Sequence, residues 1–183
     1  MTDRQCCPRD VGTDTRVADV VVRAAVPAEY GAVAELTVAV YGGEGYVRAG
    51  SPYLAELADT ARRAAAAQVL VAEYDGRIVG SLTVAPAGNE YADIARPGEI
   101  EFRMLAVAAD ARGLGAGTAL VRTVIDIART KRNAAVVLTT MPSMVDARRI
   151  YDRLGFVPVP ERNWLTPAGD PLTVLRLPLA AAD

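Results

Sequence analysis

The sequence predicts a mixed α/β fold, and three features of its 183 residues support this expectation. Runs of β-branched residues alternate with segments of helical periodicity, which is typical of strands and helices that share one sheet. Two strand-like runs flank Asp75-Gly76, a dipeptide that provides the positive φ angles of a tight antiparallel hairpin. A glycine-rich turn near residue 115 joins a strand-like segment to a helix-like one. We therefore expect the element order β-α-α-β-β-β-α-β-α-β-β.

The length fits one domain, because roughly 150 residues is the usual size of a domain. Residues 1–15 mix Thr, Asp, Arg, Gly and Pro without periodicity, which is typical of disorder. We expect residues 1–15 to form a disordered leader and residues 16–183 to form a single domain.

The first half of the domain is predicted to contain a strand, two helices and a hairpin. Pro27 suits the first turn of a helix, and Ser51-Pro52 is a favourable start for another. The stretch 41–50 is rich in Gly and Tyr, and we expect an open, mobile and exposed loop there. In chain order, the predicted elements are a strand over 17–25, a helix after Pro27, a helix over 51–66, and strands over 69–73 and 78–84.

The second half alternates strands and helices after a loop rich in Pro, Gly and Asn. Residues 99–107 form the most strand-like segment of the chain. The helix that follows the glycine-rich turn has one apolar face, formed by Leu120, Val121, Val124, Ile125 and Ala128. The predicted elements are strands over 99–107, 134–140, 156–159 and 172–179, with helices over 115–129 and 143–154.

The composition excludes several kinds of chemistry. The chain has no histidine, which excludes Ser-His-Asp and Cys-His nucleophile activation and metal sites ligated by histidine. Its two cysteines, Cys6 and Cys7, are adjacent and provide neither metal-ligand spacing nor a disulfide framework. We therefore expect no metal site, and any acid/base work falls to Glu, Asp, Tyr, Cys or water.

The charge and hydropathy of the chain limit which partners we expect and where in the cell we expect the protein. The net charge is −2 and Lys131 is the single lysine, which disfavours nucleic acid as a main partner. No apolar run approaches the roughly 18 residues of a membrane span. We expect a cytoplasmic protein that binds neither nucleic acid nor membrane, and the sequence is compatible with a homodimer.

The glycine-rich turn after residue 107 is the most informative segment. A strand that leads through glycines into a helix presents free backbone N–H groups and the positive end of the helix dipole, which together favour a bound phosphate. No lysine follows the glycines, as a P-loop requires, and Thr118 occupies the third glycine position of a dinucleotide fingerprint. The alternative is a turn that only tightens the junction between strand and helix.

Two motifs together resemble the GNAT superfamily of N-acetyltransferases. They are Arg112-x-x-Gly115-x-Gly117 after the strand that ends in Leu105-Ala106-Val107, and Ala147-x-x-x-Tyr151-x-x-x-Gly155-Phe156 some thirty residues later. The resemblance covers roughly residues 16 to 179, strand and helix order included. It implies a mostly antiparallel central sheet flanked by helices, the acyl-CoA N-acyltransferase fold, with acetyl-CoA (coenzyme A) as cofactor.

The same resemblance implies the cofactor contacts. The pantetheine arm would lie along Leu105, Ala106 and Val107. The phosphates would be held by Arg112, Gly113, Leu114, Gly115, Ala116, Gly117 and Thr118. The sequence departs from the family at Met144, where an asparagine that bonds the cofactor arm is common.

Glu101 is the candidate general base. Strand alternation predicts one face formed by Glu99, Glu101, Arg103, Leu105 and Val107, and an opposite face formed by Ile100, Phe102, Met104 and Ala106. A carboxyl on a face that becomes apolar toward the cofactor should have a raised pKa, which suits a base. The alternative is a structural ion pair between Glu101 and Arg103 or another arginine.

Tyr151 is the candidate general acid, because the resemblance implies that this tyrosine returns a proton to the sulfur of CoA. A phenol with a pKa near 10 is a suitable donor to a thiolate. The alternative is a tyrosine of the core. The backbone N–H of Val107 would polarise the thioester carbonyl if a bulge frees it from the ladder.

The first two helices are where the superfamily forms its acceptor cleft. Acids and tyrosines lie in or beside them, which would favour a cationic amine, although each residue could equally belong to a solvated helix face. These candidates are Glu29, Glu35, Glu44, Tyr41, Tyr46 and Tyr53.

The predicted function is transfer of the acetyl group of acetyl-CoA to a primary amine of a small molecule or peptide, directly within a ternary complex. The alternative is a catalytically silent acyl-CoA-binding or regulatory module.

Overall fold

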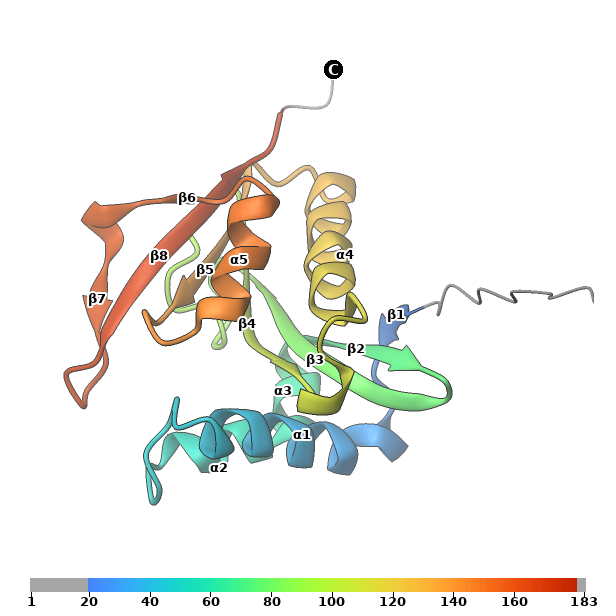
Figure 1. Ribbon diagram of the computed structural model, residues 1–183. Coiled ribbons are helices and arrows are strands. Elements are labelled where there is room, and N and C mark those ends of the chain that lie inside the picture. The colour runs from blue at the N-terminus through green and yellow to red at the C-terminus, as the bar shows by residue number, and fades with distance from the viewer. Residues whose placement is uncertain (1–19, 181–183) are drawn as a thin grey trace, which may run out of the picture.

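One β-sheet organises the computed structural model, which describes residues 20–180 (Figure 1). The strand order is β1-β2-β3-β4-β5-β8-β6, and β7 pairs with β8 beside this path. The strands are β1 (Val21–Ala24), β2 (Gln68–Tyr74), β3 (Arg77–Pro86), β4 (Glu99–Val107), β5 (Ala135–Thr140), β6 (Val157–Pro158), β7 (Trp164–Leu165) and β8 (Pro171–Pro178). The leader predicted over residues 1–15 lies outside the described residues, as do Cys6 and Cys7.

The helices cover both faces of the sheet (Figure 1). They are α1 (Tyr30–Gly43), α2 (Tyr53–Ala58), α3 (Thr60–Ala66), α4 (Ala116–Thr130) and α5 (Val145–Arg153), with short 3-10 turns at Pro27–Glu29, Ala109–Ala111 and Pro160–Arg162. On one face, α4 and α5 pack over Phe102 and its neighbours, whereas α1 to α3 cover the other face. None of these helices is long and apolar enough to cross a bilayer.

The pairing confirms the predicted mixed, mostly antiparallel sheet. Every neighbouring pair is antiparallel except β4 and β5, which are parallel. The predicted hairpin is also present, with φ angles of 50° at Asp75 and 72° at Gly76. Among the strands of residues 20–180, β7 alone has no counterpart among the predicted elements.

Two expectations for residues 41–66 were wrong. The helix predicted over 51–66 is divided into α2 and α3 at Asp59, whose ψ of 68° is not helical. The carboxylate of Asp59 accepts a hydrogen bond from the N–H of Arg62 (3.0 Å) and so caps α3. Upstream, α1 continues through Gly43 and buries Tyr41, so the exposed loop begins later than expected.

A β-bulge in β4 overturns the predicted alternation of its side chains. Ser81 of β3 faces Ala106 of β4, and Thr83 faces Arg103. The two residues are two positions apart on β3 but three apart on β4, so β4 contains one extra residue. Within the bulge, Met104 has a φ of 56°. Leu105 and Val107 therefore pack on the α4 side together with Phe102, and Met104 and Ala106 pack on the α1 side. The extra residue reverses the facing of every later side chain of the strand.

The sheet opens where its two parallel strands meet. β4 and β5 pair only over Glu99–Glu101 and Ala135–Val137, although both strands continue beyond these residues. From Phe102 onward, β4 is paired with β3 alone, and from Leu138 onward β5 is paired with β8 alone. This separation creates the space in which the candidate site lies.

Candidate active site

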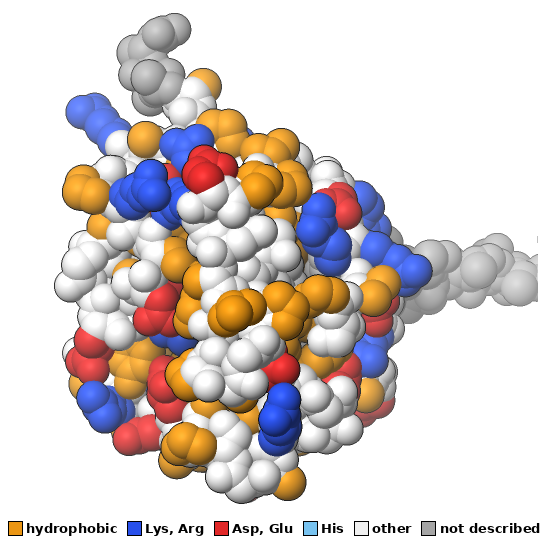
Figure 2. All heavy atoms as spheres, turned by 90° about the vertical axis from the view of Figure 1, so that its left-hand side faces the viewer, with side chains coloured by type: hydrophobic (Ala, Val, Ile, Leu, Met, Phe, Trp, Pro, Cys, Tyr) orange, Lys and Arg blue, Asp and Glu red, His pale blue; other side chains and the backbone are white. Residues whose placement is uncertain are grey.

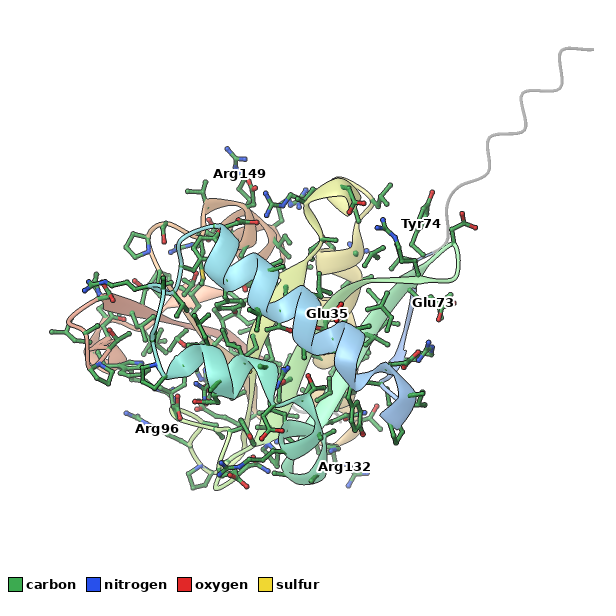
Figure 3. All side chains as sticks on the ribbon, turned by 90° about the horizontal axis from the view of Figure 1, so that it is seen from below. Glu35, Glu73, Tyr74, Arg96, Arg132 and Arg149 are labelled. Carbon is green, nitrogen blue, oxygen red and sulfur yellow. The ribbon has the colours of Figure 1, made fainter. Side chains whose placement is uncertain are left out.

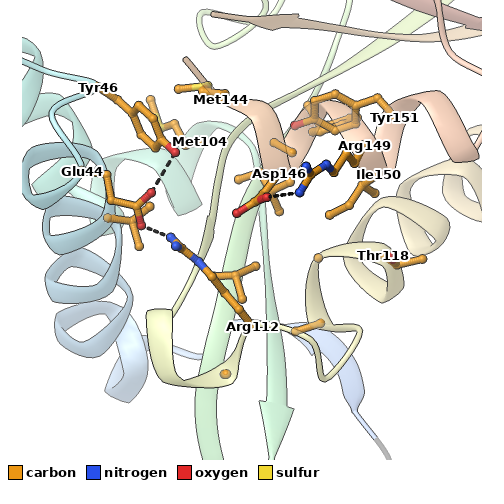
Figure 4. A pocket seen from close by; sticks show the side chains of 18 of the residues that line it. Glu44, Tyr46, Met104, Arg112, Thr118, Met144, Asp146, Arg149, Ile150 and Tyr151 are labelled. Carbon is orange, nitrogen blue, oxygen red and sulfur yellow. Dashed lines mark hydrogen bonds and ion pairs between the residues drawn. The ribbon is translucent and has the colours of Figure 1, made fainter. Parts of the chain in front are cut away.

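A first cavity of about 750 Å³ extends from the gap between β4 and β5 to the start of α4 (Figure 4). Its walls are the bulged half of β4, the glycine-rich turn, the end of α1 and the inner side of α5. Leu105 and Val107 line it because the bulge turns them to this side of the sheet.

The glycine-rich turn forms the narrow end of the first cavity. Gly113 and Gly115 both have φ angles of 86°, and the space where their Cβ atoms would lie is open. The first intrahelical bond of α4 runs from the N–H of Ala119 to the carbonyl of Gly115 (2.9 Å), so the N–H groups of Ala116, Gly117 and Thr118 have no intrahelical acceptor. Backbone donors without side chains in front of them suit the phosphates of a nucleotide-derived cofactor.

Charged side chains cross the mouth of the first cavity. Arg112 on the turn forms an ion pair with Glu44, the residue that follows α1. The hydroxyl of Tyr46 donates a hydrogen bond to the same carboxylate (2.8 Å), and Arg149 pairs with Asp146 on α5 (3.1 Å; Figure 4). Arg112 is thus held by a carboxylate at the position where an anion would bind.

A second cavity of about 1480 Å³ lies on the other side of the β4–β5 gap. Its walls come from the segment 46–59, the loop before β4, the end of β5 and the segment around β7. The two cavities share six lining residues: Tyr41, Tyr46, Arg103, Met104, Thr139 and Met144. We call this shared region the junction.

Arg103 is the one charged residue among the six at the junction. Its side chain is 14% exposed, its Nη1 lies 3.0 Å from Asp93 Oδ2, and its Nη2 lies 4.0 Å from Glu56 Oε1. Burial raises the pKa of the nearby Tyr53 phenol, and the positive charge of Arg103 counteracts part of that rise. The junction therefore contains a cation beside tyrosines.

Glu101 lies beneath the loop that precedes β4, fully buried and outside the linings of both cavities. Its Oε2 accepts hydrogen bonds from the N–H groups of Ile94 (2.9 Å) and Ala95 (3.1 Å), and its Oε1 has no hydrogen-bond partner. Burial raises the pKa of Glu101 to about 7, although these N–H groups and the charge of Arg103 oppose the rise. No ion pair links Glu101 to an arginine among residues 20–180, because Arg103 pairs with Asp93 instead.

Glu99, two residues earlier on β4, binds two arginines. Arg162 (2.9 Å) and Arg176 (2.9 Å) pair with its carboxylate, which also accepts the N–H of Arg96 (3.0 Å). Burial alone would raise the pKa of Glu99, but these hydrogen bonds together lower it. Arg162 additionally donates to the carbonyl of Ile94. Glu99 and Glu101 thus anchor one wall of the second cavity.

Tyr151 lies on α5 and lines the first cavity while its ring packs in the core. The ring contacts Phe102 and Phe156 at centroid distances of 5.8 and 5.9 Å. Burial raises the pKa of the Tyr151 phenol, so the hydroxyl keeps its proton at neutral pH. Both roles considered from the sequence, a core tyrosine and a proton donor, are compatible with this position (Figure 4).

The structure brings together most of the predicted site residues. Of those assigned to the cofactor, Leu105, Val107, Arg112, Gly113, Gly115, Ala116, Gly117 and Thr118 line the first cavity. Ala106 and Leu114 do not, because the bulge turns Ala106 to the α1 side and Leu114 is exposed. Val107 lies opposite Gly80 in the ladder, and the bulge precedes it.

The predicted acceptor residues lie in different parts of the structure. Tyr41 and Tyr46 lie at the junction and Tyr53 lines the second cavity. Glu29 lies in neither cavity and pairs with Arg23 (2.6 Å), whose hydrogen bond lowers the pKa of Glu29 to about 2. Glu35 is exposed on the outer side of α1 (Figure 3), and Glu44 lines the first cavity.

Arg103 and Asp93 were not predicted to belong to the acceptor region. Arg103 was treated only as a partner of Glu101, and nothing in the periodicity around Asp93 distinguishes it from other loop acids. The loop that holds Asp93 is positioned by backbone hydrogen bonds to the distant Glu101 carboxylate. Among residues 20–180, no group of three or more metal-ligating side chains occurs.

Comparison with known proteins agrees with this geometry. The model of the Acetyltransferase (GNAT) family matches residues 34–156, which is well over half of the chain. The chain belongs to this family. The matched segment contains most of α1, all of β4, the glycine-rich turn and α5, and so includes most of the first cavity.

Solved GNAT structures share the fold over most of this chain. A GNAT-family protein from Desulfovibrio desulfuricans is 21% identical, covers 88% of this chain and all of its own, and superposes with a TM-score of 0.69. A GCN5-related N-acetyltransferase from Kribbella flavida is 26% identical, with 87% of this chain and 98% of its own covered and a TM-score of 0.65. A Salmonella typhimurium protein, solved with its cofactor acetyl-CoA, is 22% identical, with 91% and 99% covered and a TM-score of 0.63.

Two curated relatives from Xenopus tropicalis match a shorter segment. Camello, described as a probable N-acetyltransferase, is 40% identical over 86 residues, which are 47% of this chain and 36% of camello. N-acetylaspartate synthetase is 34% identical over 86 residues, 47% of this chain and 29% of the relative. The match thus spans about a third of the length of these relatives. Acetyl-CoA, the cofactor implied by the sequence, is confirmed as the cofactor of the GNAT family.

Proposed function

We propose that this chain transfers the acetyl group of acetyl-CoA to a primary amine of a small molecule or peptide, directly within a ternary complex. One observation carries the proposal: two separate cavities meet at the six residues of the junction. A donor in one cavity and an acceptor in the other would meet at one point. Such positioning supplies a large part of the rate of a two-substrate reaction.

The first cavity fits the donor. Open space in front of Gly113 and Gly115 and the free N–H groups at the start of α4 suit its phosphates. Leu105 and Val107 provide an apolar wall that suits the pantetheine arm. Bound there, acetyl-CoA supplies an acetyl thioester: the acceptor nitrogen forms the new C–N bond, the C–S bond breaks, and CoA leaves as the thiol.

Two protons must be handled in this exchange. We assign the proton lost by the amine to Glu101, acting through water, since its Oε1 has no partner and its pKa of about 7 suits a base at neutral pH. We assign the proton gained by the thiolate to Tyr151, whose hydroxyl is protonated at that pH and whose side chain is at the wall of the first cavity.

The proposal is tested by measuring thiol release from acetyl-CoA with amino acids, polyamines, aminoglycosides and peptides as acceptors. Mass spectrometry identifies the acetylated product, and calorimetry measures the affinity of acetyl-CoA separately. We expect turnover with at least one class of amine. Tight binding of acetyl-CoA without turnover of any amine would instead identify a silent acyl-CoA-binding module.

A further inference from the structure

We propose that the acceptor is an α-amino acid, whose carboxylate is bound by Arg103 at the junction while its amino group faces the first cavity. This inference rests on the proposed function and names the class of its second substrate. It replaces the cationic amine that the acids and tyrosines of the first helices favour.

The hydrogen bonding of Arg103 differs from that of the other buried arginines. Arg63 donates to Thr83, Leu57 and Thr60, and Arg162 donates to Glu99 and Ile94. Arg103 pairs with Asp93 through Nη1, its Nη2 lies 4.0 Å from Glu56 Oε1, and its side chain also hydrogen-bonds with Tyr53. Its Nε and Nη2 form the edge of the guanidinium that binds a carboxylate through two parallel hydrogen bonds, and the Glu56 carboxylate near this edge lies beyond hydrogen-bond distance.

The guanidinium of Arg103 lies at the wall of both cavities. Four buried side-chain atoms in the described part of the chain have no partner and no contact with solvent, and they belong to Arg63, Glu101, Asn133 and Trp164. The nitrogens of Arg103 are not among them, and the residue lines both cavities. The guanidinium of Arg103 therefore lies beside the point where the acceptor must react.

Side chains of both charges line the second cavity, with five carboxylates and four arginines among them. Three ion pairs line it: Arg48 with Asp170 (3.3 Å), Arg62 with Glu90 (3.0 Å) and Arg103 with Asp93 (3.0 Å). Figure 2, which looks onto the side of the molecule that carries β7, likewise shows acidic and basic side chains interspersed. Three of the five carboxylates are each paired with an arginine, so a zwitterion finds both signs within one ion pair.

Covalent geometry links the carboxylate to the reacting nitrogen. In an α-amino acid both groups are bonded to the same carbon, so a carboxylate held by Arg103 keeps the nitrogen at the junction. Asp93 beside Arg103 can accept a hydrogen bond from the ammonium group before its proton is lost. An amine without a carboxylate would place its positive charge against the guanidinium instead, which disfavours binding.

The decisive experiment compares acceptors that differ only at the carboxylate. Thiol release is measured with wild-type protein and L-phenylalanine, L-phenylalaninamide and phenethylamine, and with the corresponding sets for leucine and glutamate. We expect kcat/KM for the best amino acid to exceed that of its amide and its decarboxylated amine by about 10-fold or more, as for hydrogen bonds to a charged group. Equal or better use of the amides and simple amines overturns the proposal, whether or not any variant folds.

Variants then assign the preference to Arg103. In Arg103→Gln, KM for the amino acid should rise by about 10-fold or more while the affinity of acetyl-CoA, measured by calorimetry, is unchanged. Arg103→Lys keeps the charge without the two-donor edge and should recover part of the loss. Arg122→Gln, on the exposed side of α4 and outside both cavities, is the matched control. A preference for amino acids that survives in Arg103→Gln overturns the assignment.

Failure of the proposed function gives a different result. If some amine is acetylated without regard to a carboxylate, the proposed function stands and the α-amino acid does not. If acetyl-CoA binds but no amine is acetylated, the proposed function is wrong. In that case, calorimetry of the amino acids against the CoA-bound protein decides the present inference: binding that Arg103→Gln abolishes retains the site, and absence of binding overturns it.

Discussion

Arg112 and Glu44 form an ion pair that connects the glycine-rich turn to the end of α1 across the mouth of the first cavity. The same carboxylate accepts a hydrogen bond from Tyr46, which lies at the junction. A phosphate bound at the turn therefore competes with Glu44 for Arg112. This contact links the cofactor end of the site to its acceptor end.

We expect Glu44→Gln to bind acetyl-CoA more tightly, because the arginine no longer has to leave a carboxylate. Exposed ion pairs contribute up to about 1 kcal/mol, so the gain should be roughly 2- to 5-fold in Kd, measured by calorimetry. Glu35→Gln, on the outer side of α1, provides the control. Weaker binding by Glu44→Gln would mean that Glu44 supports the cradle.

Gly115→Glu should abolish detectable binding of acetyl-CoA while the protein remains folded. The substitution places bulk and negative charge in the open space in front of the turn, where phosphates are expected. It also strains a residue with a φ of 86°, so the control must carry similar strain. Gly76→Glu, in the β2–β3 hairpin with a φ of 72° and open space around it, meets that need. Loss of binding in both variants would indicate unfolding and not a blocked cradle.

Glu101→Gln should lower kcat by about 100-fold or more at neutral pH, the usual loss when a general base is removed. The wild-type rate should rise as pH passes about 7, where the carboxyl ionises, and the variant should lack this inflection. Because more of the amine is free at high pH, part of the rate should return there. An unchanged pH–rate profile would leave Glu101 as an anchor of the loop only.

The same substitution should change how stability depends on pH. The folded protein raises the pKa of Glu101 from 4.5 to about 7, so it favours the protonated form. The contribution of this group to the free energy of unfolding is therefore full below pH 4.5 and decreases as pH rises to about 7. Urea unfolding between pH 4.5 and 8 should show wild type losing stability relative to Glu101→Gln over that range. Parallel pH profiles for the two proteins would contradict the raised pKa.

Tyr151→Phe should lower kcat while the affinity of acetyl-CoA stays near that of wild type. The ring and its contacts with Phe102 and Phe156 remain, so thermal unfolding should change little. The defect should diminish with thioesters of more acidic thiols, because their leaving groups need less protonation. Tyr74→Phe, near the tip of the β2–β3 hairpin (Figure 3), is the control. Wild-type turnover by Tyr151→Phe, once chemistry is rate-limiting, would assign the residue to the core.

The sequence predicted those features that depend on local pattern. The bounds of β4, the Asp75-Gly76 hairpin and the glycines that open α4 each follow from residue types with strong backbone preferences. The division between α2 and α3 was also encoded locally, by Asp59 as a helix cap, but the apolar pattern on either side concealed it.

Features that depend on distant partners were not predictable in this way. Methionine has no preference for a positive φ, so the bulge at Met104 reflects the register that β3 imposes. Glu101 is bound by backbone N–H groups of a loop. Almost any residue in that loop could provide such a group, so the sequence does not reveal the contact. Arg103 becomes a junction residue only because two cavities on opposite sides of the β4–β5 gap meet beside it.

The three residue pairs that join β4 to β5 act as a short spine between two leaves, one built from β1 to β4 and the other from β5 to β8. Each leaf contains a longer ladder, with seven pairs between β2 and β3 and six between β5 and β8. Amide hydrogen exchange should therefore be fastest among strand residues along the edges that border the spine. A ligand that bonds to both edges would add rungs to the ladder that joins the two leaves, so its binding would make the two leaves unfold as one.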